Sequence, residues 1–135
     1  MKYLLDTDIC IYLIKRKPAS VINKLATLAN EDVGLSTISL FELQFGVENS
    51  QYRMQSQKAL DHFLEPISHI LPVDQPVARS AAIIRADLKQ KGLIIGPYDI
   101  LIAAVALSRG LILLSNNTRE FQRVGGLLLE NWADL

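Results

Sequence analysis

Short apolar segments alternate with longer segments of helical periodicity along this chain of 135 residues, and this alternation most constrains its fold. The pattern predicts strands at residues 2–5, 33–36, 68–73, 111–114 and 127–130. It predicts helices at 9–15, 19–30, 40–49 and 53–64, then from Pro76 to a stop at Gly92 and from Pro97 to a stop at Gly110. We therefore expect an α/β protein, a three-layer α/β/α sandwich with a mostly parallel sheet of four to five strands, formed by a single domain of residues 1–135.

Composition narrows the class of protein. Half of the residues are hydrophobic, which favours a packed core over disorder. The formal net charge is zero, so a polyanionic partner would need a local basic patch. Cys10 is the only cysteine, which excludes an internal disulfide. Asp6 and Asp8 interrupt the apolar start of the chain, and the apolar run 100–107 is too short to span a membrane, so we expect a cytoplasmic protein.

Three acidic residues lie beside apolar segments and far apart in the sequence. Asp6 follows the first predicted strand, Glu42 lies inside residues 39–45, and Asp99 precedes the run 100–107. Charged groups avoid such surroundings unless they are paired or bound to a metal. If the fold brings the three carboxylates together, they form a site for a divalent cation, and Mg²⁺ and Mn²⁺ both prefer such hard oxygen ligands.

Each acid also has a purely structural explanation. Asp6 could cap the following helix, although Asp8 is better placed to do so. Ser39 and Glu42 have the spacing of a capping box. Asp99 lies in the first turn of a helix, where the macrodipole favours an acid. In the segment 115–121, Asn116 and Asn117 could be turn formers, and Glu120 could be a solvated acid on a helix.

Four segments in order carry a resemblance to a known family. They are Leu-Leu-Asp-Thr-Asp at 4–8, Phe-Glu-Leu-Gln-Phe-Gly at 41–46, Gly-Pro-Tyr-Asp-Ile-Leu-Ile-Ala-Ala at 96–104 and Ser-Asn-Asn-Thr-Arg-Glu-Phe at 115–121. Together they resemble the PIN-domain ribonucleases of the VapC toxin type. The resemblance implies Mg²⁺- or Mn²⁺-dependent cleavage of RNA, with the family's three core acids at Asp6, Glu42 and Asp99.

The chain departs from the family pattern at two places. The family's fourth acid is commonly an aspartate soon after the fourth strand, where this chain has Asn116 and Asn117, so Glu120 is the nearest carboxylate. Relatives commonly carry Asn where this chain has Asp8. Asp8 either adds charge to the site or caps the first helix, and we favour the cap.

The resemblance also implies partners. A VapB-type antitoxin would restrain the toxin, which would form a homodimer within a larger toxin–antitoxin assembly. The RNA would be a transfer RNA, with the initiator tRNA anticodon stem-loop as the expected target, and its cleavage would inhibit translation. An exposed share of the apolar residues in the stretch 9–28, together with Leu40, Phe41, Phe45 and Tyr52, would form a groove for an amphipathic partner helix, whereas burial in the core accounts for most of these residues. The expected substrate contacts are Thr7, Tyr98, Asn116, Asn117 and Arg119, with Arg123 as a further phosphate contact.

Two other functions compete with this interpretation. Asp6-Thr7-Asp8 matches the D-x-D of haloacid-dehalogenase phosphatases, which use an aspartyl nucleophile, although Cys10 stands where Thr or Val is usual. Alternatively, the chain is a catalytically inactive PIN scaffold that binds RNA or a protein.

His62 and His69 are interpreted as structural residues.

Overall fold

Five parallel strands form the centre of the computed structural model, which describes residues 1–133. Their order across the sheet is β3-β2-β1-β4-β5, and every neighbouring pair is parallel. The expected domain of residues 1–135 includes 134 and 135, which lie outside the described residues. The strands are β1 (Tyr3–Leu5), β2 (Val33–Ser36), β3 (His69–Leu71), β4 (Ile112–Leu114) and β5 (Leu128–Glu130).

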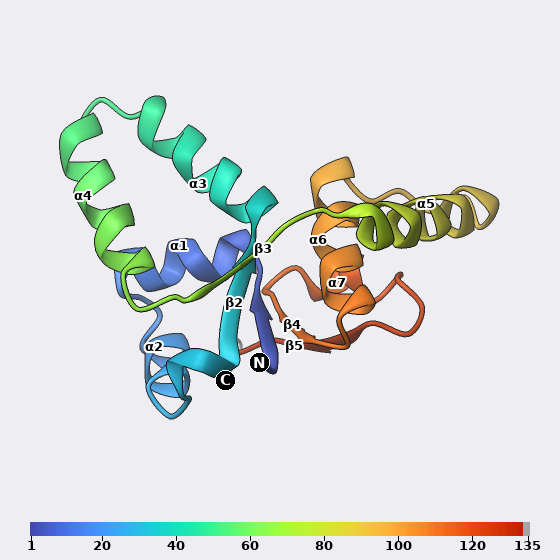
Figure 1. Cartoon of the computed structure of the whole chain (residues 1–135), viewed down its shortest axis with the longest axis horizontal. Coiled ribbons are helices and arrows are strands. Elements are labelled where there is room, and N and C mark those ends of the chain that lie inside the picture. Colours follow the sequence, from blue (N-terminus) through green and yellow to red (C-terminus); the bar gives the residue numbers. More distant parts are fainter. Residues whose placement is uncertain (134–135) are drawn as a thin grey trace.

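Helices cover both faces of this sheet, which confirms the α/β/α sandwich. Figure 1 shows α1 to α4 on one side of the sheet and α5 to α7 on the other. The helices are α1 (Thr7–Lys15), α2 (Ala19–Leu25), α3 (Thr37–Glu48), α4 (Arg53–Leu64), α5 (Gln75–Gln90), α6 (Pro97–Ser108) and α7 (Thr118–Phe121), with a 3₁₀ turn at Asn30–Asp32.

The central strands divide the core into two clusters, because successive side chains of a strand point to opposite faces. Leu4 and Leu113 pack with α5, α6 and Phe121 on one face. Leu5 and Leu114 pack with α1 to α4 on the other face. Strands β1 and β4 are thus covered on both sides, which explains why their sequences are apolar throughout.

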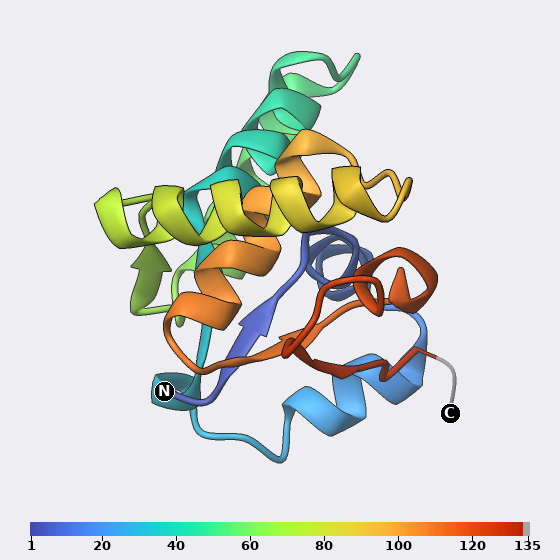
Figure 2. The ribbon, with the colours of Figure 1, turned by 90° about the vertical axis from the view of Figure 1, so that its right-hand side faces the viewer.

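Helix α6 is the most buried helix of the fold. Figure 2 shows α5 crossing over α6, so that α6 lies between α5 and the sheet. Residues Ile102 to Ala106 are fully buried, in agreement with the uniformly apolar sequence of this helix. No helix within residues 1–133 has the length and apolarity that crossing a membrane requires.

The helix starts differ from the sequence prediction at α1 and α3. Helix α1 begins at Thr7 because Asp6 is its N-cap, with Oδ1 accepting a hydrogen bond from the Thr7 N–H. The prediction that Asp8 caps this helix is therefore wrong. Helix α3 begins at Thr37 because the Ser36 hydroxyl accepts from the Ser39 N–H. Ser39 thus lies inside α3, which rules out a capping box of Ser39 and Glu42.

Helix α2 is shorter than predicted. It ends at Leu25 instead of extending to residue 30. The Thr27 hydroxyl donates to the Lys24 carbonyl, a local bond that competes with continuation of the helix. Leu28 still packs against the same core cluster as Leu25, from the turn that follows α2. The apolar spacing therefore identified residues that pack against the core correctly while overestimating the helix length.

The tight contact between β2 and β3 gives a first testable prediction. A Cβ atom added to Gly34 would lie 2.7 Å from the backbone oxygen of His69, whereas a Cβ at Gly46 in α3 would meet nothing within 4 Å. We expect Gly34→Ala to lower the free energy of unfolding by about 1–3 kcal/mol through overpacking. Gly46→Ala should raise it by roughly 0.5–1 kcal/mol, because alanine favours the helix. Urea denaturation of both variants measures this, and equal effects of the two substitutions would contradict it.

Candidate active site

Asp6 is the buried acid at the centre of the candidate site. It directly follows β1 and its side chain is 5% exposed. One carboxylate oxygen accepts from the Thr7 N–H at 2.8 Å and the other from the Ser115 hydroxyl at 2.7 Å. Burial, followed by repulsion from Asp8, raises the pKa of Asp6 to about 8. The fold therefore fixes the orientation of this carboxylate while making its charge costly.

Glu42 reaches the same edge of the sheet from α3. The Thr7 hydroxyl donates to Glu42 Oε1 at 2.8 Å and lies 2.9 Å from the Ser39 hydroxyl. Thr7 is thus the link between the first strand and α3, since its backbone N–H binds Asp6 and its side chain binds Glu42. The structure brings together two of the three predicted acids through this one residue.

Asp99 and Glu120 approach from the other side of the sheet. Asp99 lies in the first turn of α6, and Glu120 lies in α7. Burial, then repulsion from Glu42 and Glu120, raises the pKa of Asp99 to about 6. Asn117 donates to Glu120 Oε2 at 3.1 Å, so Asn117 orients the Glu120 carboxylate. Glu120 is the acid nearest the position where the family pattern has its fourth aspartate.

Asp8 is a fifth acid of this group. Its Oδ2 accepts from the Asn116 N–H at 3.1 Å, whereas its Oδ1 is buried without a hydrogen-bond partner. Burial raises the pKa of Asp8 above its usual value. Sequence reasoning assigned Asp8 to helix capping and did not single out Ser115. The position of Ser115 directly after β4, at the same edge as Asp6, was the available signal.

The acids have little positive charge to balance them. Ion pairs within residues 1–133 lie elsewhere, at Met1–Asp32, Arg53–Glu48, Lys91–Asp87 and Arg109–Asp74. No three His, Cys, Asp or Glu side chains within these residues converge closely enough to enclose an ion on their own. Mg²⁺, however, is commonly held by one or two carboxylates and several waters. The all-oxygen donor set and the unpartnered Asp8 oxygen therefore fit a hydrated divalent cation.

The predicted substrate contacts surround these acids at different degrees of exposure. Arg119 and Asn116 are exposed, whereas Asn117 is half-buried. Tyr98 is 46% exposed, next to Asp99. Arg123 donates to the Ile94 carbonyl at 2.6 Å, so it supports the loop before α6 while its guanidinium keeps its charge.

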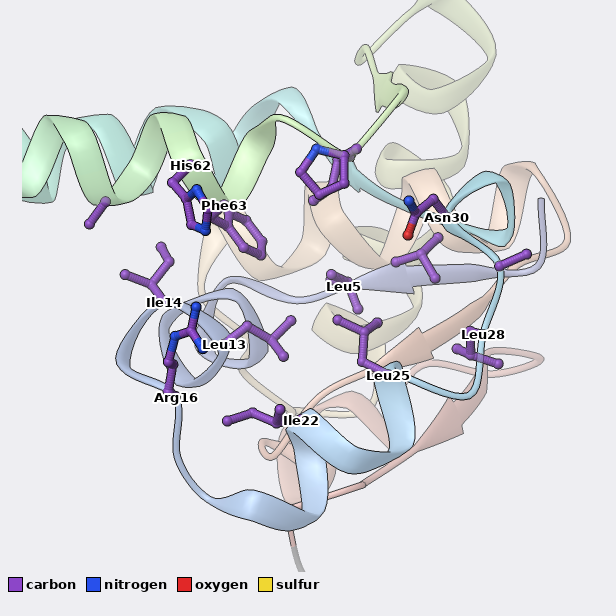
Figure 3. Close-up of a pocket in the computed structure, with 15 residues that line it drawn as sticks. Leu5, Leu13, Ile14, Arg16, Ile22, Leu25, Leu28, Asn30, His62 and Phe63 are labelled. Carbon is purple, nitrogen blue, oxygen red and sulfur yellow. The ribbon is translucent and has the colours of Figure 1, made fainter.

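An apolar pocket lies away from the acids, between α1, α2 and α4. Figure 3 shows apolar side chains from α1 and α2, including Leu13, Ile22 and Leu25, facing Phe63 of α4 across this pocket. Its volume is about 450 Å³, and Arg16 and His62 also line it. None of the five acids contributes to its lining. The fold thus has an acidic edge, formed by Asp6, Asp8, Glu42, Asp99 and Glu120, and a separate apolar pocket.

Comparison with known proteins places this arrangement in a family. The PIN domain family model matches residues 3–127. The tRNA(fMet)-specific endonuclease VapC of Shigella flexneri is 43% identical over 133 residues, covering 98% of this chain and 99% of the relative. Ribonuclease VapC2 of Rickettsia felis is also 43% identical, covering 98% of each chain. The chain belongs to the VapC family of PIN-domain proteins.

Solved structures of VapC-family complexes share the whole fold. A VapBC2 structure from Rickettsia felis, bound to a DNA fragment from its promoter, matches with a TM-score of 0.91 and 41% identity, covering 98% of this chain and 99% of that one. DNA-bound VapBC from Salmonella typhimurium matches with a TM-score of 0.91 and 38% identity, covering 98% of each. Membership of the VapC family, whose relatives are named ribonucleases, disfavours the haloacid-dehalogenase alternative.

The burial of Asp6 predicts an unusual pH dependence of stability. The pKa of Asp6 is about 8 in the folded protein against 3.8 as the ordinary value, so the folded state retains a proton that the unfolded state loses. The stability that this proton provides is full below about pH 4 and is lost as the pH rises towards 8. In EDTA, Asp6→Asn should therefore raise the free energy of unfolding near pH 8 by about 2 kcal/mol or more relative to the wild type.

Urea denaturation at several pH values measures this difference. Asp87→Asn is the matched control, because Asp87 lies on α5 in an exposed ion pair with Lys91. If the free energies of unfolding of the wild type and Asp6→Asn differ by the same amount at every pH, the burial of a costly charge at Asp6 is contradicted.

Proposed function

We propose that this protein is the toxin of a type II toxin–antitoxin system and acts as a metal-dependent endoribonuclease. The observation that carries the proposal is the gathering of Asp6, Glu42, Asp99 and Glu120 at one edge of the sheet with little balancing charge. Its full-length similarity to a tRNA(fMet)-specific endonuclease supports the same activity. These four acids are the proposed catalytic residues.

Asp6, Glu42 and Asp99 are the proposed metal ligands, and Mg²⁺ or Mn²⁺ the proposed cofactor. Such an ion, when bound, lowers the pKa of a coordinated water and neutralises charge on a phosphoryl group. Ser115 and Thr7 hold the Asp6 carboxylate in one orientation, and Thr7 also holds Glu42. Glu120, oriented by Asn117, supplies the carboxylate that the family's fourth aspartate would otherwise provide.

The polar residues around the acids are the proposed substrate contacts. Arg119 is exposed in α7 beside Glu120 and can bind a phosphate that flanks the cleaved one. Thr7, Asn116 and Asn117 offer hydrogen-bonding groups at the same edge, and Tyr98 offers an aromatic ring. The proposed RNA is a transfer RNA, with the initiator tRNA anticodon stem-loop as the first candidate, so that cleavage inhibits translation in the cytoplasm.

A VapB-type antitoxin is the proposed protein partner. The apolar pocket between α1, α2 and α4 suits the apolar face of an amphipathic helix, and the fold matches toxins solved as VapBC complexes. A tail that continues from such a helix could then reach the acidic edge. The protein is further proposed to form a homodimer within this assembly.

Metal-dependent RNA cleavage tests the activity. Antitoxin-free protein is incubated with total cellular RNA and Mg²⁺ or Mn²⁺, and the 5′ ends of the fragments are mapped. We expect discrete cuts that EDTA abolishes and that Asp6→Asn and Asp99→Asn each reduce by about a hundredfold or more, because each variant removes a carboxylate of the site. Asp87→Asn should cut as the wild type does. Intact RNA in the presence of bound Mn²⁺ would instead support the inactive scaffold.

Substitution in the apolar pocket tests the partner site. Ile22→Asp should weaken binding of the antitoxin by tenfold or more, because it buries a carboxylate in an apolar contact, while leaving RNA cleavage unchanged. Ile83→Asp is the control, since Ile83 is 66% exposed on α5, across the sheet from the pocket. Calorimetric titration with the antitoxin measures both. Equal affinity of the two variants would place the partner helix elsewhere.

A further inference from the structure

Two exposed aromatic rings meet beside the acidic edge. Phe41 of α3 and Tyr98 of α6 have ring centroids 5.5 Å apart and an interplanar angle of 73°. Phe41 is 52% exposed and Tyr98 is 46% exposed. Neither ring belongs to the two core clusters, so core packing alone does not account for this pair.

The pair is directly attached to the candidate active site. Phe41 precedes Glu42 in α3, and Tyr98 precedes Asp99 at the start of α6. Glu42 and Asp99 are close enough for repulsion from Glu42 to raise the pKa of Asp99. The contact between the two rings therefore joins α3 and α6, the helices that carry Glu42 and Asp99. This contact holds the rings at the margin of the acidic edge.

The chemistry of RNA fits this position. A phosphodiester that reaches the acids carries a nucleotide on each side, so its neighbouring bases lie one sugar away from the point of cleavage. Unpaired bases are recognised chiefly by stacking on exposed aromatic side chains. In an edge-to-face pair, the edge of one ring points at a face of the other ring. The remaining ring faces stay open to a third aromatic group such as a base.

We propose that Phe41 and Tyr98 form a stacking platform for an unpaired base of the RNA next to the cleaved phosphate. This inference rests on the proposed ribonuclease function and adds a specificity to it. A base can reach the platform only after leaving its helix, so the platform selects cut sites in loops and single strands over paired RNA. Phe41 and Tyr98 are specificity residues, whereas the acids carry the chemistry.

Binding of a defined RNA probe tests the platform. The probe is a single-stranded RNA of mixed sequence that contains a fluorescent purine analogue, studied with Ca²⁺ in place of Mg²⁺ to limit cleavage. We expect Phe41→Leu and Tyr98→Leu each to weaken binding roughly five- to hundredfold, the range expected for loss of one stacked base. Both should also reduce the quenching of the analogue. Tyr98→Phe, which keeps the ring, should retain affinity and quenching.

Two controls separate stacking from other effects. Tyr52→Leu alters an aromatic residue that is 67% exposed at the start of α4 and should bind the probe as the wild type does. Circular dichroism and thermal unfolding establish that each variant is folded. The same probe annealed into a full duplex should bind weakly to the wild type and respond little to Phe41→Leu or Tyr98→Leu.

Three results would overturn the proposal. Unchanged quenching in folded Phe41→Leu and Tyr98→Leu would exclude stacking. An equal loss of affinity and quenching in Tyr52→Leu would show that the effect depends on exposed apolar surface in general. If the two variants instead altered sedimentation of the free protein or antitoxin affinity, with RNA binding intact, the rings would form a protein interface. Each of these failures leaves metal-dependent cleavage by the wild type in place, whereas absence of cleavage would remove the proposed function itself.

Discussion

The burial of the Asp6 carboxylate at the end of β1 is the interaction on which the rest of the site depends. Its two oxygens are occupied by the Thr7 N–H and the Ser115 hydroxyl, which ties the ends of β1 and β4 together. The same capping bond starts α1 at Thr7, and the Thr7 hydroxyl then reaches Glu42. One buried carboxyl group thus sets a strand end, a helix start and the position of a second acid.

The sequence predicted this architecture well because strand burial and carboxyl-end positions are local properties. Asp6 and Ser115 follow apolar strands, so their meeting at one edge follows from a parallel sheet. The errors in the helix starts arose where two side chains compete for one role. Asp6 and Asp8 both suit a cap, and only the backbone path out of β1 decides between them. The contact of Thr7 with Glu42 joins residues 35 positions apart and has no local signal. The catalytic roles of the four acids, and the metal-binding roles of Asp6, Glu42 and Asp99, stay predictions.

The acids and the apolar pocket lie in different parts of the molecule. The acids line one edge of the sheet, the apolar pocket lies between α1, α2 and α4, and the exposed rings of Phe41 and Tyr98 stand at the margin of the acids. None of the acids lines the pocket, whereas Phe41 and Tyr98 directly precede Glu42 and Asp99 in the sequence. This separation allows tight association with a partner and control of activity to depend on different residues.

Binding of Mn²⁺ to the protein without RNA tests the central claim most directly, namely that the gathered carboxylates need a cation. Electron paramagnetic resonance counts free Mn²⁺ as it is titrated into the wild type and into Asp6→Asn. The account predicts saturable binding by the wild type that weakens at least tenfold in Asp6→Asn, with Asp87→Asn unchanged. Wild-type protein that binds no Mn²⁺, or binds it equally after loss of the Asp6 charge, would contradict the account.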